Sequence, residues 1–285
     1  IPRRAGLGAS SALTVAMSLA IRELYPYRIS DTGVLRPPRR DQGKLPRLES
    51  AEARQIARFC QAAETEFVSV PCGLLAPLVS LLGKEFHVVS VDIMHQSTEL
   101  LPLIGDLALV VCETGVPRKR EGRLHRELRQ HCVSAARALR AKSLRSVEPR
   151  HLSSRRKKLT QREYECAYHI VGENQRVTFA DVALQESDIE QFGQYMLQSH
   201  ESCREFFRNS SRELDLLVQL ARAHPACIGA RLAGSGFGGA TVNLVKFSQL
   251  EEFASSIAAL YEKLTNQKIK PLFCRIVKGA GEHVG

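Results

Sequence analysis

The stretch GARLAGSGFGGATVNLV (residues 229–245) places two apolar segments on either side of a glycine-rich turn, GSGFGG. The residues after the turn alternate between apolar and polar side chains, which is typical of a half-buried strand. A dinucleotide-binding fold has a GxGxxG turn followed directly by a helix, so this context argues against that fold. The stretch predicts two strands joined either by a plain tight hairpin or by a turn whose backbone closely approaches another group.

Strands and helices surround this stretch without the regular alternation of a parallel sheet, which indicates an α+β fold. Strands are predicted at residues 87–93, 107–113, 227–234, 240–247 and 271–277. Helices are predicted at residues 10–24, 50–67, 121–141, 162–182, 188–208, 210–223 and 251–264, with a short apolar helix after the Pro-Cys-Gly turn at residues 71–73.

Composition limits the classes of protein and of partner. The chain has 285 residues, a length that suits one or two domains. Its formal net charge of +10 favours an anionic partner. Its eight cysteines include no CxxC pair, which is typical of reduced thiols in a cytoplasmic protein and argues against zinc. No stretch approaches the ~18 uninterrupted apolar residues of a membrane span, so no membrane contact is expected.

Two stretches rich in basic residues are predicted to be solvated loops. Residues 25–50 lose helical periodicity and carry several prolines and arginines, and residues 150–162 read RHLSSRRKKLTQR. The second stretch lacks the interleaved aromatic residues that stack on single-stranded bases. Nucleic-acid binding is therefore the least favoured of three functional hypotheses, because scattered charge with no binding motif is weak support for it.

The chain opens with IPRRAGLGASSALTV, residues 1–15, in which two glycines precede a serine pair and an apolar helical run. Ser10 and Ser11 stand where a helix N-cap is expected. Glycines followed by a helix N-terminus favour a phosphate cradle, although no Gly-Lys-Ser/Thr is present as in a P-loop. A purely structural helix start and a signal peptide are the alternatives. Arg22 and Glu23 occupy the place of a cleavage site, and the first residue is not Met, so we expect an upstream N-terminus instead.

Five segments together, in this order, resemble galactokinases of the GHMP kinase superfamily. They are PRRAGLGASSAL, QAAETEFVSVPCGLL, IVGENQRV, QSHESCREFFRNSSRELDLLV and GARLAGSGFGGATVNLV. The resemblance implies the GHMP kinase fold, with a ribosomal protein S5 domain 2-like N-terminal domain over residues 1–145. A ferredoxin-like C-terminal domain would cover residues 146–285.

The resemblance also implies ATP, Mg²⁺ and a galactose-like sugar as ligands. Glu64 matches the family's metal-binding carboxylate and Ser10 its metal-binding hydroxyl, and Mg²⁺ takes such oxygen ligands together with phosphates. Without the matching flanks, Glu64 would be interpreted as a surface carboxylate. Gly73 and His125 match sugar-contacting positions, where His125 replaces a tyrosine. The positions that match the ATP site are Gly6, Leu7, Gly8, Ala9, Ser10, Ser11, Gly234, Gly236 and Gly238.

The sequence departs from the family pattern at several of these positions. Ala76 stands where the family has the aspartate that orients or deprotonates the attacking sugar hydroxyl, and an alanine side chain can do neither. Arg4 replaces a glycine of the phosphate loop, and Ala9 replaces a serine. The family's sugar-binding segment would lie before Ile1. From these departures we expect little or no sugar phosphorylation by this chain, with Ala76→Asp restoring little unless that segment is supplied.

Two functional hypotheses remain ahead of nucleic-acid binding. The first is an ATP-dependent kinase that phosphorylates the anomeric hydroxyl of galactose or a related sugar, impaired by Ala76. The second is a catalytically silent protein that still binds nucleotide and sugar, as a sensor or a decayed remnant. The two hypotheses differ in the effect of Ala76 on catalysis. Loss of a general base lowers the rate roughly 10²–10⁴-fold, but the phosphate cradle and the metal site do not depend on that base.

Overall fold

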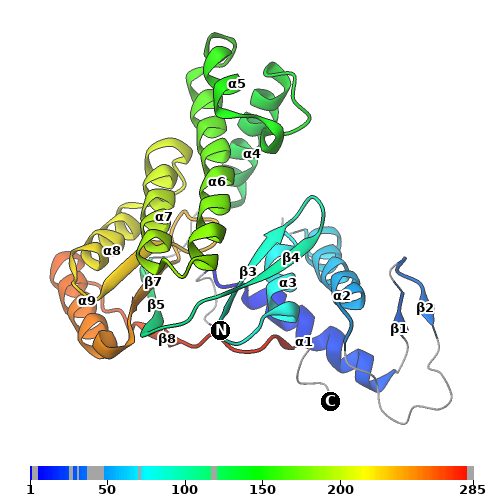
Figure 1. Ribbon diagram of the computed structural model, residues 1–285, viewed down its shortest axis with the longest axis horizontal. Helices are drawn as coiled ribbons and strands as arrows, with labels where there is room; N and C mark the ends of the chain where they lie inside the picture. Colours follow the sequence, from blue (N-terminus) through cyan, green and yellow to red (C-terminus); the bar gives the residue numbers. More distant parts are fainter. Residues whose placement is uncertain are drawn as a thin grey trace. The chain divides into compact units, whose positions relative to one another are not determined.

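The computed structural model describes residues 1, 6–25, 28–30, 32–36, 48–69, 72–116 and 121–280 (Figure 1). Its Cα trace separates into two compact units. Of the described residues, the first unit contains Ile1, those between 7 and 104, and 276–280, and the second contains Gly6 and those between 105 and 275. The division into domains at residue 145 stays a prediction. Arg4 lies outside the described residues.

The described part of the first unit contains three α-helices and two separate antiparallel hairpins. Its core lies among the helices, which contribute Val15, Ala53, Ile56 and Leu78, each at most 2% exposed. The 3.6-residue spacing of these side chains explains why the segments fold as amphipathic helices. The elements are α1 (Ala9–Leu24), β1 (Arg28–Ile29), β2 (Leu35–Arg36), α2 (Ser50–Ala62) with a π-helical turn (Ala63–Phe67), α3 (Leu75–Leu82), β3 (His87–Asp92) and β4 (Ser97–Pro102).

A buried ion pair joins α1 to α2. Arg22 Nε donates to Glu52 Oε1 at 2.8 Å and Arg22 Nη2 donates to Oε2 at 2.9 Å, and both side chains are less than a tenth exposed. The two parallel bonds fix the relative orientation of the helices, since a guanidinium matches a carboxylate in this geometry. Removal of Arg22 would leave the buried carboxylate of Glu52 without this ion pair.

The second unit is built on a four-stranded antiparallel sheet in the order β6-β7-β5-β8. It contains β5 (Leu107–Glu113), α4 (Glu121–Ala138), α5 (Pro149–Ser154), α6 (Gln161–Gln185), α7 (Ile189–Ser202) with a π-helical turn (Cys203–Phe207), α8 (Arg212–Ala223), β6 (Cys227–Leu232), β7 (Ala240–Lys246), α9 (Leu250–Thr265) and β8 (Leu272–Cys274). Short 3-10 turns occupy Leu144–Ser146, Arg156–Lys158 and Phe247–Gln249.

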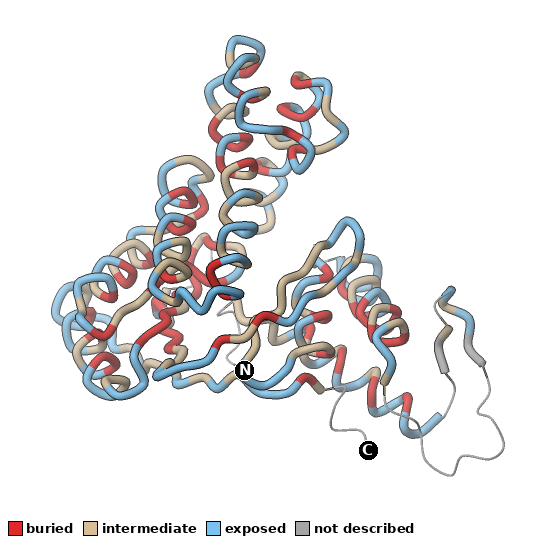
Figure 2. Tube along the Cα trace, in the orientation of Figure 1, coloured by how far each residue is buried: buried red, intermediate tan, exposed pale blue. Residues whose placement is uncertain are grey.

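Two larger hydrophobic cores and a small cluster of Cys203, Leu214 and Leu232 stabilise the described part of the second unit. One lies between the sheet and helices α8 and α9, with Val110, Val245, Phe253 and Tyr261 completely buried. The other joins α4, α5 and α6, which project from the sheet in Figure 1, and it is visible as the buried stripes of these helices in Figure 2. A capping box at Thr160 begins α6 and satisfies backbone N–H groups of its first turn.

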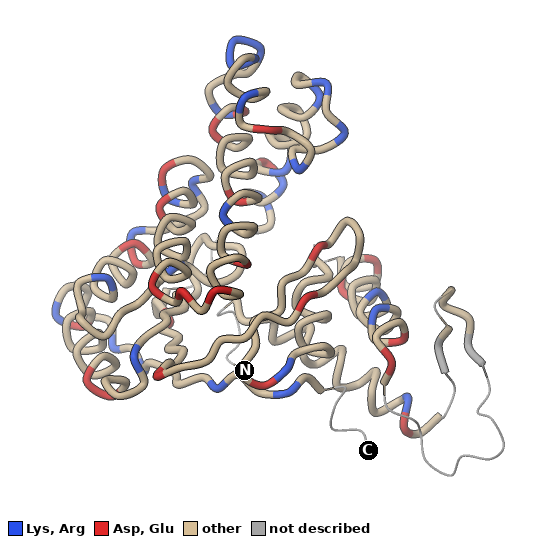
Figure 3. The backbone as a smooth tube through the Cα atoms, in the orientation of Figure 1, with Lys and Arg blue, Asp and Glu red and all other residues tan. Residues whose placement is uncertain are grey.

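The structure corrects several sequence predictions. The basic stretch 150–162 was predicted to be a loop, but most of it forms α5 and a 3-10 turn, with its lysines and arginines around α5 in Figure 3. Pro149 at the first position of α5 favours this helix start. Two strands, β1 and β2, lie in the stretch predicted to be an irregular loop. Strand β4 carries no clear apolar alternation and was not predicted.

A close helix–strand contact in the second unit provides a stability prediction. Gly193 on α7 packs so tightly on β6 that an added Cβ would lie 2.1 Å from the Ile228 carbonyl oxygen. Because this neighbour is backbone, Gly193→Ala is expected to destabilise the protein by about 1–3 kcal/mol. At Gly122, the nearest atom would be 3.8 Å away, so Gly122→Ala is the matched control. Chemical unfolding of both variants checks this, and equal midpoints would contradict the packing argument.

Candidate active site

The glycine loop before α1 leaves the N-terminal end of this helix without a side-chain cap. Gly8 is the N-cap residue with a φ of 69°, and no side chain among the described residues caps the helix. The prediction that the serine pair forms the cap is therefore wrong. The first intrahelical acceptor is the Gly8 carbonyl, which receives Ala12 N–H at 2.9 Å. The N–H groups of the first turn thus have no partner within the helix and are available to an anion.

Both serine hydroxyls instead bind one carboxylate. Ser10 Oγ donates to Glu64 Oε2 at 2.7 Å, and Ser11 Oγ donates to Glu64 Oε1 at 2.9 Å. Glu64 is only 6% exposed and lies in the π-helical turn that ends α2. This widened turn, a feature often found at functional sites, brings the carboxylate to the first turn of α1. The structure therefore brings together the two residues matched to the metal site.

Cys72 lies beside this carboxylate. Its Sγ is 3.7 Å from Ser11 Oγ, and its carbonyl oxygen accepts from Gln61 Nε2 at 3.0 Å. Burial raises the pKa of the Cys72 thiol and the charge of Glu64 raises it further, although the hydrogen bond to Ser11 opposes both. Cys72 is therefore a neutral thiol at neutral pH, and Glu64 is the only negative charge among these side chains.

Ala76 contacts the glycine loop directly. A Cβ placed on Gly8 would lie 3.1 Å from the Cβ of Ala76, which is the second residue of α3. Gly8 is therefore required both by its positive φ and by this close approach. A longer side chain at position 76 would start beside the loop. Gly73, matched to a sugar contact, lies exposed before α3 with no atom within 4 Å of a Cβ built on it.

The second glycine-rich turn, residues 234–239, joins β6 to β7 in the second unit. Gly234, Gly236 and Gly238 have φ values of 65°, 83° and 110°. A Cβ on Gly234 would lie 2.7 Å from the Gly6 carbonyl oxygen, so these two matched glycines are neighbours. The prediction of a turn whose backbone closely approaches another group is thereby confirmed.

His125 contacts this second turn. Its ring, on α4, packs edge-on against the ring of Phe237 with centroids 5.2 Å apart. The structure therefore places His125, which matches a sugar-contacting position of the family, beside the turn at residues 234–239, which matches part of its ATP site. Its role in sugar binding stays a prediction.

The donor set around Glu64 fits magnesium better than a transition metal. No group of three or more His, Cys, Asp or Glu side chains that could hold a metal occurs among the described residues. Mg²⁺ is usually bound through one or two carboxylates plus phosphate oxygens and water. A single buried carboxylate with a neighbouring hydroxyl meets that requirement, provided that a nucleotide supplies the remaining oxygens.

Comparison with known proteins identifies the family. Residues 182–263 match the family model "GHMP kinases C terminal". The galactokinase of Roseiflexus sp. (strain RS-1) is 32% identical over 286 residues, covering 99% of this chain and 68% of the relative. The chain belongs to the galactokinase family. The galactokinase of Canis lupus familiaris is 34% identical over 262 residues, covering 92% of this chain and 61% of the relative.

Two solved kinase structures share the fold. The Lactococcus lactis galactokinase complexed with galactose superimposes with a TM-score of 0.85 at 20% identity, over 98% of this chain and 68% of that one. The L. major mevalonate kinase in complex with R-mevalonate gives a TM-score of 0.56 over 96% of this chain and 66% of that one. The predicted α+β class and GHMP kinase fold are confirmed. No helix in the described part of this galactokinase-family chain is long and apolar enough to cross a membrane.

Two residues that contact the second turn were missed by sequence reasoning. Thr114 N–H and Oγ1 both donate to the Gly239 carbonyl, at 2.8 and 3.0 Å. Asn209 Nδ2 donates to the Ser235 carbonyl at 3.0 Å. Both contacts join residues that are far apart along the chain. A single sequence carries no signal for them beyond the general preference of Asn and Thr for turns.

Proposed function

We propose that this chain is an ATP-dependent kinase that transfers the γ-phosphoryl group of ATP to the anomeric hydroxyl of galactose or a related sugar, at a low rate. The observation that carries the proposal is the pair of hydrogen bonds from Ser10 and Ser11 to the buried Glu64 at the open N-terminus of α1. An anion-binding helix end beside one buried carboxylate is an arrangement that binds a nucleotide polyphosphate with its Mg²⁺.

Within this proposal, each matched residue has one role. The loop that contains Gly6, Leu7, Gly8 and Ala9 supplies backbone N–H groups to the phosphates. The carboxylate of Glu64 and the hydroxyl of Ser10 would hold Mg²⁺, and the ion would supply positive charge to neutralise the phosphate oxygens. Ser11 orients the second oxygen of the carboxylate. The turn with Gly234, Gly236 and Gly238 binds ATP through its backbone, and Gly73 and His125 contact the sugar.

The low rate follows from Ala76. Attack of the anomeric hydroxyl forms an oxygen–phosphorus bond, breaks the bond to ADP and releases the hydroxyl proton. Ala76, beside Gly8, can neither accept that proton nor orient the hydroxyl. The proton passes to solvent, and the chain supplies only phosphate positioning and charge neutralisation. A general base is worth roughly 10²–10⁴-fold, so a slow reaction is expected.

The same position favours the second candidate, a protein that binds nucleotide and sugar without turnover. Phosphorus NMR of the protein with Mg·ATP and galactose separates the two. The kinase proposal predicts slow accumulation of a sugar phosphate with equal ADP, which stops when galactose is omitted. Saturable binding of both ligands with no sugar phosphate would favour the silent binding protein. No Mg-dependent binding of ATP would contradict both.

A further inference from the structure

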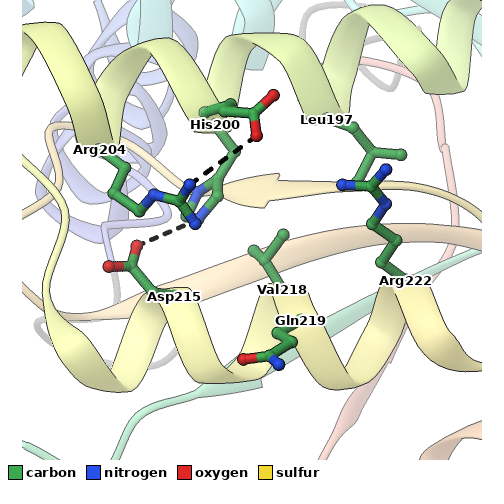
Figure 4. Close-up of a pocket in the computed structure, with 8 residues that line it drawn as sticks. Leu197, His200, Arg204, Asp215, Val218, Gln219 and Arg222 are labelled. Atoms are coloured by element: carbon green, nitrogen blue, oxygen red, sulfur yellow. Dashed lines mark ion pairs between the residues drawn. The ribbon is translucent and has the colours of Figure 1, made fainter.

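A series of side-chain contacts connects the end of β6, through α7 and the start of α8, to the segment that binds the turn at residues 234–239. The first bond is donated by Leu232 N–H to His200 Nδ1 at 3.2 Å. His200 is 3% exposed. Because Nδ1 is the acceptor, the ring proton is on Nε2, which lies 3.2 Å from Asp215 Oδ1 (Figure 4).

Asp215 then connects this histidine to the segment before α8. Its Oδ1 also accepts a hydrogen bond from Ser210 Oγ at 2.5 Å. Burial raises the pKa of Asp215, but the neighbouring His200 ring, the hydrogen bond from Ser210 and the charge of Arg204 together outweigh it and hold the pKa below its usual value. Ser210 is not needed as a helix cap, because Ser211 is the N-cap of α8 and accepts from Leu214 N–H. The bond from Ser210 therefore has another role.

Asn209, the residue before Ser210, holds the glycine-rich turn itself. Its carbonyl accepts from Phe237 N–H at 2.5 Å, and its Nδ2 donates to the Ser235 carbonyl at 3.0 Å. A Cβ on Gly236 would lie 2.0 Å from the Asn209 carbonyl oxygen, so the two backbones are in direct contact. Asn209 is 5% exposed. The turn is thus bonded at both its second and fourth residues to one buried asparagine.

We propose that His200, Asp215, Ser210 and Asn209 form a positioning network that holds the turn at residues 234–239 in the conformation that binds ATP. This inference rests on the proposed function. The network acts through the backbone of the turn, whose N–H directions determine how well it accepts phosphate or ribose oxygens. Leu232 precedes the turn, while Ser235 and Phe237 lie within it, so the network ties the turn to the strand end that supports it.

Substitutions in this network can be made without overpacking. A cavity of about 130 Å³ lies between α7 and α8 beside the His200–Asp215 pair (Figure 4). Asp215→Ala removes the acceptor for both neighbours, whereas Asp215→Asn keeps one acceptor oxygen and is expected to rescue the network. Glu213→Ala is the matched control, because it also removes an acidic residue from the first turn of α8.

A second variant tests the other end of the network. Asn209→Asp keeps the size of the side chain but replaces the donor to Ser235 with an acceptor. Its matched control is Asn266→Asp, at the C-terminal end of α9 in the left-handed conformation that Asp also tolerates.

Amide hydrogen exchange without nucleotide tests the network independently of the proposed function. Peptides that cover residues 233–239 are expected to exchange about tenfold faster in Asp215→Ala and Asn209→Asp, and at the wild-type rate in Asp215→Asn and both controls. Titration with Mg·ATP should then show a dissociation constant raised about tenfold in the same two variants. Far-UV circular dichroism and the exchange of α9 peptides report whether each variant is folded.

Each outcome has a defined meaning. Unchanged exchange of the turn in both folded variants would contradict the network. Faster exchange with an unchanged dissociation constant for Mg·ATP would contradict its role in positioning the turn for nucleotide. If the wild-type protein binds no ATP, the proposed function fails, and faster exchange in the two variants would still support the network itself.

Discussion

Ala76→Asp is expected to raise the rate of galactose phosphorylation by about 10²–10⁴-fold, the usual contribution of a general base. The reason is geometric. Ala76 Cβ already lies against Gly8, so a carboxylate at this position begins beside the loop proposed to hold the phosphates. The variant supplies an acceptor for the hydroxyl proton that the natural side chain lacks. The measurement is kcat for sugar phosphate formation in the protein with its natural N-terminus.

Two further variants make this result specific. Ala76→Asn can orient a hydroxyl but is not a base, so it separates orientation from proton acceptance. Leu75→Asp adds a carboxylate one residue earlier at an exposed position of the same helix and is expected to leave the rate unchanged. Equal rates for Ala76→Asp and the wild-type protein would show that proton acceptance at position 76 does not limit the reaction.

Glu64→Gln is expected to weaken Mg·ATP binding by about 10–100-fold, as loss of groups around a metal usually does. Glutamine keeps the size of the side chain and one acceptor oxygen for the serine hydroxyls, so α1 and the π-helical turn should stay in place. It removes the negative charge that Mg²⁺ requires. Without Mg²⁺, the variant should bind ATP no more weakly than the wild-type protein, because the repulsion between carboxylate and phosphates is also removed.

Glu66→Gln is the matched control for this variant. Glu66 lies in the same π-helical turn as Glu64, but it is exposed. Calorimetric titration with ATP, with and without Mg²⁺, measures all three proteins. Equal dependence on Mg²⁺ in Glu64→Gln and Glu66→Gln would exclude Glu64 as the metal-binding carboxylate.

The sequence was sufficient where local patterns determine structure. Periodicity and turn residues predicted α1, α2, α4 and the strand–turn–strand at residues 229–245, because each is encoded within one segment. The glycine loop at the start of α1 was recognisable from its residue types. Residue preferences alone predict serine as the N-cap, because serine favours that position. They therefore indicate neither Gly8 as the cap nor the hydrogen bonds of Ser10 and Ser11 to Glu64.

Long-range contacts account for most of what the sequence could not predict. Strand β4 exists because it pairs with β3 over its full length, although its own residues lack alternation. Asn209 and Thr114 reach the second glycine-rich turn only after folding. The sequence showed only that an aspartate of the family is replaced by Ala76. The structure adds that Ala76 lies beside Gly8, at the glycine loop.

Calorimetric titration of the wild-type protein with ATP, in the presence of Mg²⁺ and again with the metal chelated, tests the proposed Mg·ATP site most directly. We expect saturable binding at one site per chain, with affinity that falls by about tenfold or more when Mg²⁺ is removed. Absence of binding, or equal affinity in the two titrations, would contradict the claim that the loop before α1 and Glu64 form a site for Mg·ATP.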